Sequence, residues 1–211
     1  MRHTKVIFYA GLMTALVGLA GCSGKIRYPS YYVLNVPLPR SANDPPKQVL
    51  GRVIVREFSA PRFLKEGSIA YRPSPEQLDF YNYHRWAEDP RRVVTQAMAR
   101  EIQARGLFES VDVSDSRVSP VWLITGTLDH LEEVDRGSKV SIEVSISAQL
   151  TNLRTGEVFW QGTSTKTATL DERSVTGVVS EMSRELGSAV TNLASSIQDH
   201  LAGSSSLATA R

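Results

Sequence analysis

The stretch KVSIEVSISAQLTN, residues Lys139 to Asn152, alternates apolar and polar side chains over most of its length. Apolar residues occupy every even position from Val140 to Leu150, and serine, glutamate and glutamine occupy the odd positions between them. Successive side chains of a strand point to opposite faces of the sheet, so this alternation predicts a long strand with one buried face and one wet face. Such one-sided burial is typical of an antiparallel sheet.

Further strands are predicted on both sides of this stretch. LRTG, residues 153–156, supplies a turn into EVFWQGTSTKTATL, residues 157–170, so the two segments should form a hairpin. β-Branched and aromatic runs separated by proline and glycine predict the other strands, at residues 31–36, 49–58, 68–72, 78–86, 108–113 and 121–131.

Two segments have helical instead of alternating periodicity. Asp89 offers an N-cap followed by proline, apolar residues then recur at helical spacing, and Gly106 is a natural stop, which predicts a helix over about residues 90–105. A second apolar stripe predicts a long helix over about residues 174–201. The fold class predicted from these elements is α+β, a mainly antiparallel sheet with two amphipathic helices packed on one face.

The N-terminus has the three parts of an export signal. Arg2 and Lys5 give a positive start, an uncharged and mostly apolar run follows at residues 6–20, and small residues lead to Cys22. The run is shorter than the roughly 20 residues that a membrane-spanning helix needs, so we expect a signal peptide over residues 1–21. Its end, LAGC, resembles the lipobox of bacterial lipoprotein precursors.

Cys22 is the only cysteine of the 211 residues. A lone thiol can form neither an internal disulfide nor a structural zinc site. The resemblance to the lipobox implies that Cys22 carries a diacylglyceryl group and an N-acyl chain such as palmitate, with no other cofactor. In Gram-negative lipoproteins an aspartate after the cysteine favours the inner membrane, and Ser23 stands there instead. The resemblance therefore implies the outer membrane, with the domain facing the periplasm.

The mature chain divides into a tether, one domain and a tail. Residues 22–47 are rich in proline and are predicted to be a tether, from which the strand at residues 31–36 docks on the domain. Residues 48–202 form the domain, and the small polar residues 203–211 are predicted to be disordered.

The mature chain is electrically neutral. Loss of Arg2 and Lys5 with the signal reduces the 24 basic residues by two, to 22, equal in number to the 22 acidic residues. A nucleic-acid-binding domain would need a basic stripe, so no nucleic-acid partner is expected.

Catalytic and metal-binding motifs are missing from the sequence. It contains no G-x-S-x-G elbow, no phosphate-binding loop and no H-E-x-x-H zinc helix. His84, His130 and His200 lie far apart without metal-ligand spacing. The prediction is a protein that is not an enzyme and holds no metal, with a lipid-tethered hydrolase that uses His84 or His130 as an alternative.

The block NYHRWAEDP, residues 82–90, is the first candidate for a partner interface because it is both aromatic and basic. Its candidate contact residues are His84, Arg85 and Trp86. Tryptophan and arginine are favoured anchors of protein interfaces, but a tryptophan at the end of a strand is more often part of the core.

Arg91 and Arg92 are the second candidate. They place positive charge in the first turn of the predicted helix, where it opposes the helix macrodipole at a cost of about 0.3 to 1 kcal/mol per charge. Pairing with Glu88 or Asp89 would offset this cost, and contact with an acidic partner or with lipid headgroups is the alternative.

Seven blocks follow one another along the mature chain: YYVL, VIVREFSAPRFL, IAYR, YHRWAEDP, RGLFESV, LITGTLDHLEEV and GEVFWQG. Their order and spacing resemble the ABC-type transport auxiliary lipoprotein family, which contains the paraquat-inducible lipoprotein PqiC. The resemblance implies a non-enzymatic subunit whose partners are an ABC permease system and an MCE-domain periplasmic protein.

In this family the MCE-domain proteins form conduits for lipids between the two membranes. The resemblance implies that the lipoprotein docks the far end of the conduit at the outer membrane, with a homo-oligomeric ring as one arrangement. A lipoprotein that itself binds lipid and a structural assembly factor for an outer-membrane machine stay open as alternatives.

Overall fold

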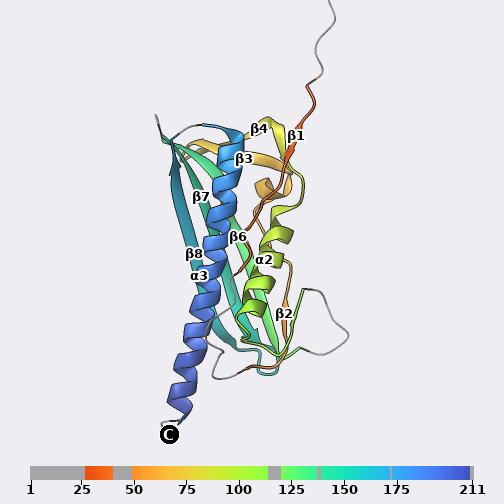
Figure 1. Ribbon diagram of the computed structural model, residues 1–211, viewed down its shortest axis with the longest axis vertical. Coiled ribbons are helices and arrows are strands. Elements are labelled where there is room, and N and C mark those ends of the chain that lie inside the picture. Colours follow the sequence, from red (N-terminus) through yellow and green to blue (C-terminus); the bar gives the residue numbers. More distant parts are fainter. Residues whose placement is uncertain (1–26, 40–48, 114–119, 137–138, 172, 210–211) are drawn as a thin grey trace, which may run out of the picture.

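The computed structural model describes residues 27–39, 49–113, 120–136, 139–171 and 173–209 (Figure 1). The predicted signal peptide, residues 1–21, and the predicted lipid attachment residue Cys22 lie outside the described residues.

Three long antiparallel strands make up the largest part of the sheet. They are β6 (Trp122–Arg136), β7 (Lys139–Asn152) and β8 (Val158–Leu170), with β7 paired to both neighbours. The bounds predicted for β7 are confirmed, and its even-numbered side chains from Val140 to Leu150 are all buried. The β7–β8 turn ends at Gly156, whose positive φ of 75° favours glycine.

Five shorter strands make the sheet mixed. They are β1 (Ser30–Tyr32), β2 (Val53–Val55), β3 (Ser68–Ser74), β4 (Gln77–Trp86) and β5 (Val111–Asp112). Strands β3 and β4 are antiparallel, but β1 with β4, β2 with β5 and β6, and β3 with β6 all pair in parallel. The prediction of a mainly antiparallel sheet is therefore wrong. Alternation along one strand shows which face is buried, but it carries no information about the direction of a partner that is distant in sequence.

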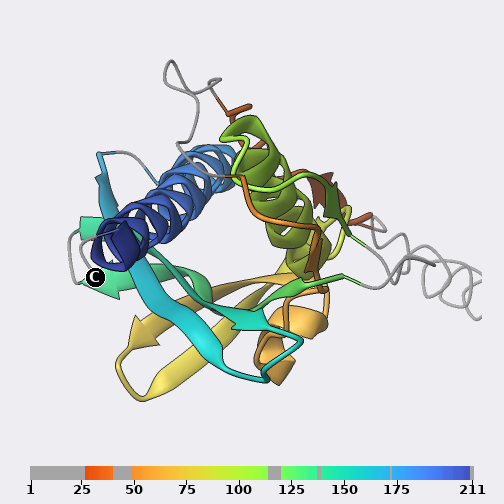
Figure 2. The same cartoon turned by 90° about the horizontal axis from the view of Figure 1, so that it is seen from below.

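Within the described residues there are two α-helices, α2 (Pro90–Ala104) and α3 (Val175–Thr209), and one short 3-10 helix, Arg62–Lys65. Helix α2 has Asp89 as its N-cap and Pro90 in its first turn, and Gly106 follows its end with a φ of 64°, as the sequence predicts. Helix α3 contacts β7, β8 and α2, and Figure 2 shows the two helices next to each other above the strands.

Helix α3 runs past its predicted end near residue 201 and reaches Thr209. Most of residues 203–211, predicted as a disordered tail, is therefore helical. Adding residues to an existing helix needs no new nucleus, so the residues beyond the buried stripe can extend α3 by propagation alone.

The core lies between the helices and the sheet. Its fully buried side chains come from every layer and include Phe58, Leu64, Ile69, Met98, Ile102, Ile124, Leu128, Ile142, Ile146, Leu150, Met182, Leu186 and Ile197. Gly126 on β6 allows the closest approach in this core. A Cβ atom there would lie 2.3 Å from the ring of Phe58 and 2.5 Å from the carbonyl oxygen of Ser147, so only glycine fits.

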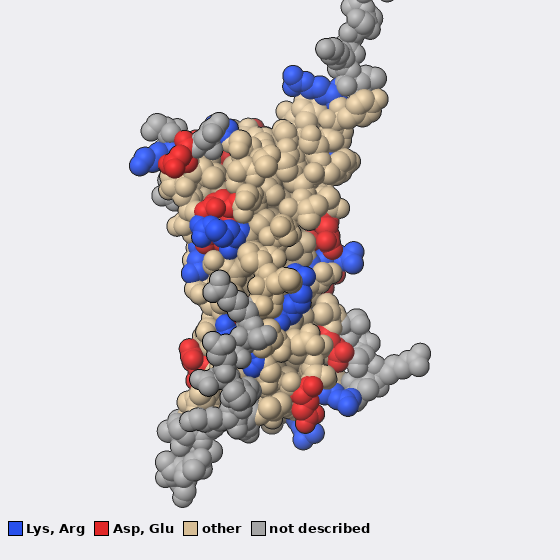
Figure 3. Space-filling view, in the orientation of Figure 1, with Lys and Arg blue, Asp and Glu red and all other residues tan. Residues whose placement is uncertain are grey.

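The segment that follows β1, residues 33–39, docks on α3, so the predicted tether of residues 22–47 is partly built into the domain. Leu34 is buried, and the backbone N–H of Asn35 donates to the Ser183 hydroxyl at 3.1 Å. A Cβ at Gly187 would lie 3.0 Å from Pro37, so this glycine lets the segment approach the helix closely. On the face shown in Figure 3, acidic and basic side chains are interspersed.

Candidate functional site

The predicted interface residues of block 82–90 lie where β1 joins the end of β4. The two strands are parallel, with Ser30 beside His84, Tyr31 beside Arg85 and Tyr32 beside Trp86. Residues paired across a sheet share a face, and successive residues alternate between faces. The structure therefore separates Arg85 from His84 and Trp86.

His84 and Trp86 belong to the inward face of this junction. The hydroxyl of Tyr32 lies 2.9 Å from Nδ1 of His84, and the ring of Tyr81 meets the imidazole edge-on with a centroid distance of 5.6 Å. Trp86 is only 6% exposed and lies in the core. Arg85 is exposed and remains a candidate for contact with a partner.

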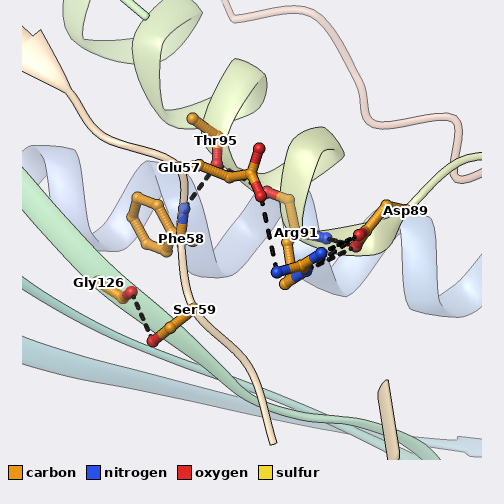
Figure 4. A network of polar contacts seen from close by, with 7 residues as sticks. All are labelled: Glu57, Phe58, Ser59, Asp89, Arg91, Thr95 and Gly126. Carbon is orange, nitrogen blue, oxygen red and sulfur yellow. Dashed lines mark hydrogen bonds and ion pairs between the residues drawn. The ribbon is translucent and has the colours of Figure 1, made fainter. Parts of the chain in front are cut away.

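Arg91 is held by carboxylates at the start of α2 (Figure 4). Its Nε lies 3.0 Å from Oδ2 of Asp89, and its Nη1 lies 3.6 Å from Glu57. The predicted pairing with Asp89 is confirmed, so this arginine offsets its own cost at the helix N-terminus. The backbone N–H of Arg91 also donates to Oδ1 of Asp89 at 3.0 Å, which makes Asp89 both cap and counter-ion.

Thr95 connects the first turns of α2 to the segment after β2 (Figure 4). Its hydroxyl donates to the carbonyl oxygen of Arg91 at 2.7 Å and accepts from the backbone N–H of Phe58 at 3.0 Å. The next residue, Ser59, pairs in parallel with Thr127 of β6. These contacts place the start of α2 at a defined position relative to the sheet.

Replacement of Asp89 by alanine is expected to lower the free energy of unfolding by about 1 kcal/mol, since an N-cap is lost, and to lower the melting temperature by about 2–4 °C. Burial alone raises the pKa of Asp89, but the hydrogen bonds from Arg91 outweigh it and hold the pKa below its ordinary value of 3.8. The charged carboxylate therefore stabilises the fold above that pH, and this contribution is lost as the pH falls through the lowered pKa.

Thermal melts from pH 3 to pH 7 check this prediction. Asp89→Asn is the matched control, since asparagine keeps the cap acceptor and removes the charge. The alanine variant should lose more stability than the asparagine variant at pH 7. Equal losses would assign the whole effect to the ion pair and contradict the capping role.

Arg92 points to solvent and lines a small hollow. Its neighbours there are Glu57, Thr95, Gln96 and Val113, and the hollow has a volume of about 190 Å³. Among the described residues no ion pair to Arg92 is found. Its charge, in the first turn of α2, has the carboxylates of Glu57 and Asp89 nearby but forms no direct ion pair with either.

A network of polar contacts surrounds the buried carboxylate of Glu133, and the sequence analysis did not predict it. Glu133 of β6 is fully buried, accepts from the Tyr81 hydroxyl at 2.5 Å and pairs with Arg173 at 2.8 Å. Arg173 also pairs with Asp135 at 2.8 Å. Burial and the hydrogen bond to Glu133 raise the pKa of Tyr81 to about 12, so its hydroxyl remains a donor at every physiological pH.

This network connects β4, which carries Tyr81, with β6, which carries Glu133, and with Arg173 just before α3. Next to Glu133 along β6, Glu132 pairs with Arg72 of β3 at 3.0 Å, which brings in a fourth part of the fold. Its only signal in the sequence is the acidic pair Glu132–Glu133 next to an apolar strand. Buried carboxylates need paired cations, so that pair could have indicated a cluster, but it could not indicate which arginines take part.

A further hollow lies over the polar face of the central strands. It has a volume of about 570 Å³ and is lined by Ser59, Thr125, Gly126, Thr127, Ser147, Ala148, Gln149, Gln161, Gly162 and Thr163. None of these side chains titrates near neutral pH, so the hollow lacks the acid and base that proton-transfer catalysis needs.

The two histidines of the hydrolase alternative have other partners. His84 lies 2.9 Å from the Tyr32 hydroxyl, and His130 lies 3.1 Å from Glu132. The third histidine of the domain, His200, packs edge-on against Phe159. In the described part of the chain, no histidine ring hydrogen-bonds to a serine or threonine hydroxyl, and no three metal-ligating side chains cluster. The described residues also contain no helix with the length and apolar character to cross a membrane.

Comparison with known proteins gives a family and a fold. Residues 32–197 match the family model described as ABC-type transport auxiliary lipoprotein component. No curated protein matches the chain.

Two crystal structures show the same fold. One is a Xanthomonas campestris protein with the family model DUF330, at 17% identity and a TM-score of 0.73, covering 84% of this chain and 99% of its own. The other is an uncharacterized protein at 14% identity and a TM-score of 0.62, covering 81% of this chain and 99% of its own.

Proposed function

The chain belongs to the ABC-type transport auxiliary lipoprotein component family, and from that premise we propose that it is an outer-membrane subunit of an intermembrane lipid transport system. Family membership makes it a transport-associated lipoprotein of the cell envelope that works with an ABC transport system, and it suggests a role other than catalysis. The proposal adds an MCE-domain protein as the periplasmic partner, whose outer end this domain docks.

The anchor in this proposal is lipid on Cys22, as the LAGC sequence suggests. One acyl chain binds a membrane only marginally, whereas the diacylglyceryl group and the N-acyl chain together give a durable anchor. Ser23 after the cysteine supports sorting to the outer membrane.

We place the docking surface at Arg92, on the basis of its exposure and its surroundings. It is exposed, it lies beside a hollow with Gln96 and Val113, and the polar network around Asp89 fixes the helix turn that bears it. A partner carboxylate would give this exposed charge the direct ion pair that it does not form within the described residues, and would offset its cost at a helix N-terminus.

Charge reversal at this site tests the proposal. Arg92→Glu is expected to weaken in-cell crosslinking to the MCE-domain protein by at least about tenfold, because like charges across an interface cost more than about 1.4 kcal/mol. The fold should keep or gain stability, since a negative charge suits the first turn of a helix.

Arg100→Glu is the matched control, because Arg100 is exposed on the same helix and undergoes the same charge change. Crosslinking of this control should equal that of the unchanged protein. Absence of any crosslink between the unchanged protein and the MCE-domain protein would contradict the proposal as a whole. Equal crosslinking of both variants would contradict only the site.

A second candidate function is lipid binding by the domain itself, which one hollow favours. It lies where residues 37–39 cross α3, has a volume of about 540 Å³, and combines apolar Pro37, Leu38 and Pro39 with Lys166. Arg105 and Arg184 also line it, but Arg105 pairs with Glu101 of the same hollow and Arg184 pairs with Glu181 and Glu185. An apolar wall next to a cation suits an anionic amphiphile. Native mass spectrometry of the purified chain should then show a co-purified lipid, and an empty chain would remove this candidate.

Self-association is a further part of the proposal. Among the described strands, β8 pairs only with β7, so its other edge is available to a neighbouring chain. β8 contains four threonines, no proline and a single charged residue, Lys166, so most of this edge is compatible with pairing. We propose a homo-oligomer as the form that docks.

A further inference from the structure

The outward face of the β1–β4 junction carries large side chains that the fold does not bury. Tyr31 of β1 is 64% exposed, and Tyr83 of β4 is 44% exposed. Tyr28 before β1 is 80% exposed, and Val33 after it is 61% exposed. We name Tyr28, Tyr31, Val33 and Tyr83 the tyrosine patch.

Strand alternation explains the exposure of Tyr31 and Val33, since the side chains that alternate with them, Tyr32 and Leu34, pack inward. The inward face of the same junction uses Tyr32, His84 and Trp86 to complete the domain. The outward face has no hydrophobic task in the domain, yet it carries tyrosines where solvent-facing strands usually carry short polar or charged residues. Clusters of exposed apolar and aromatic side chains indicate a surface that meets another phase or partner.

The charge at the edge of the patch is positive. The guanidinium carbon of Arg27 lies 5.8 Å from the centre of the Tyr83 ring, a cation–π arrangement. Arg85 is the strand neighbour of Tyr31 and is exposed on the same face. Tyrosines flanked by arginines are the composition that membrane–water interfaces favour, because the rings sit among headgroups and the cations attract anionic lipids.

The tyrosine patch also lies close to the proposed anchor. Six residues of chain separate Cys22 from Tyr28, and a fully extended chain spans at most about 3.6 Å per residue, or roughly 22 Å in all. Tyr28 can therefore never be further than that from the lipidated residue, whatever the path of the chain between them. The short length of chain between Cys22 and Tyr28 therefore keeps this face of the domain close to the bilayer.

From the exposure, the charge and the position along the chain, we propose that the tyrosine patch rests on the lipid headgroups and orients the domain on its membrane. This inference rests on the proposed lipid anchor at Cys22. Figure 1 places β1 and β4 at one end of the long axis of the molecule, and in Figure 3 much of the surface at that end is uncharged, with both basic and acidic side chains at its margins. The β7–β8 turn and the C-terminal end of α3 lie at the other end and face away from the membrane.

A single fluorescent label measures this contact. Cys22 is the only cysteine, so in the mature lipidated protein an introduced cysteine is the only free thiol. The variants are Tyr31→Cys in the patch and Val158→Cys, which is 45% exposed at the far end, where β8 begins. Each is labelled with an environment-sensitive dye and reconstituted into vesicles of phosphatidylethanolamine and phosphatidylglycerol.

The label at position 31 should shift its emission to shorter wavelength in vesicles, and nitroxide lipids should quench it. The label at position 158 should keep the emission that it has in water. Adding Tyr28→Ser and Tyr83→Ser to the Tyr31→Cys variant should reduce the shift and the quenching.

Three other results would overturn the inference, and they differ in cause. Intact mass spectrometry that finds no lipid on Cys22 would remove the anchor and the oriented contact together. Lipidated protein whose labels at positions 31 and 158 respond equally would remove the tyrosine patch and leave the anchor. A shift at position 31 that appears with rising protein concentration before vesicles are added would assign the patch to a second copy of the chain instead.

Discussion

Replacement of Arg173 by alanine is expected to lower the free energy of unfolding by about 3 kcal/mol, because it leaves a fully buried carboxylate without its cation. Glu133 has no exposed surface, and Arg173 supplies two of its hydrogen bonds, at 2.8 and 3.1 Å. The Tyr81 hydroxyl would remain as a neutral donor. A loss of this size corresponds to a decrease of about 6–12 °C in the melting temperature of a domain this long.

Thermal and urea unfolding measure the effect, with Arg184→Ala as the control. Arg184 pairs with Glu181 and Glu185, but its side chain is 57% exposed, so removal should cost less than about 1 kcal/mol. Double replacement of Arg173 by alanine and Glu133 by glutamine should recover part of the loss, since the unpaired charge is gone. Equal effects of the two arginine variants would mean that water solvates Glu133 and that the network is not truly buried.

Replacement of Cys22 by serine is expected to abolish lipid attachment and cleavage of the signal together. A hydroxyl is a far weaker nucleophile than a thiolate, so no thioether to diacylglycerol can form. The chain should then accumulate as its 211-residue precursor and fail to reach the outer membrane. Intact mass spectrometry and separation of the two membranes measure both results.

Ser23→Asp is the matched control for sorting. This variant should be lipidated and cleaved like the unchanged protein but remain at the inner membrane, as the lipobox resemblance implies. Normal processing of the serine variant at position 22 would contradict the lipid anchor. Outer-membrane location of the aspartate variant would contradict only the sorting argument.

Local pattern was enough to predict the elements of this fold. The alternation in residues 139–152 predicted β7 with its bounds and its buried face, and Asp89 with Gly106 predicted both ends of α2. These features depend on side chains a few residues apart, so the sequence shows them directly.

Pairing between distant segments was not predictable in the same way. The parallel partners of β2 lie on β5 and β6, and the cation for Glu133 comes from Arg173, 40 residues later. The interface block 82–90 shows the same limit of sequence-based prediction. Its composition does not show that Trp86 faces the core and Arg85 faces outward; this follows from the parallel pairing of β1 with β4. Composition marked the block as aromatic and basic, whereas the pairing decides which of its residues a partner can reach.

The length of α3 determines how far the domain extends from the end that carries the tyrosine patch. A helix of 35 residues rises about 52 Å, and α3 begins at the end of the molecule that carries the tyrosine patch. With that end on the bilayer, the helix acts as a stiff rod that carries its C-terminal end up to about 52 Å into the periplasm. The anchor would hold the protein at the membrane, and the rod would set how far the domain extends away from it.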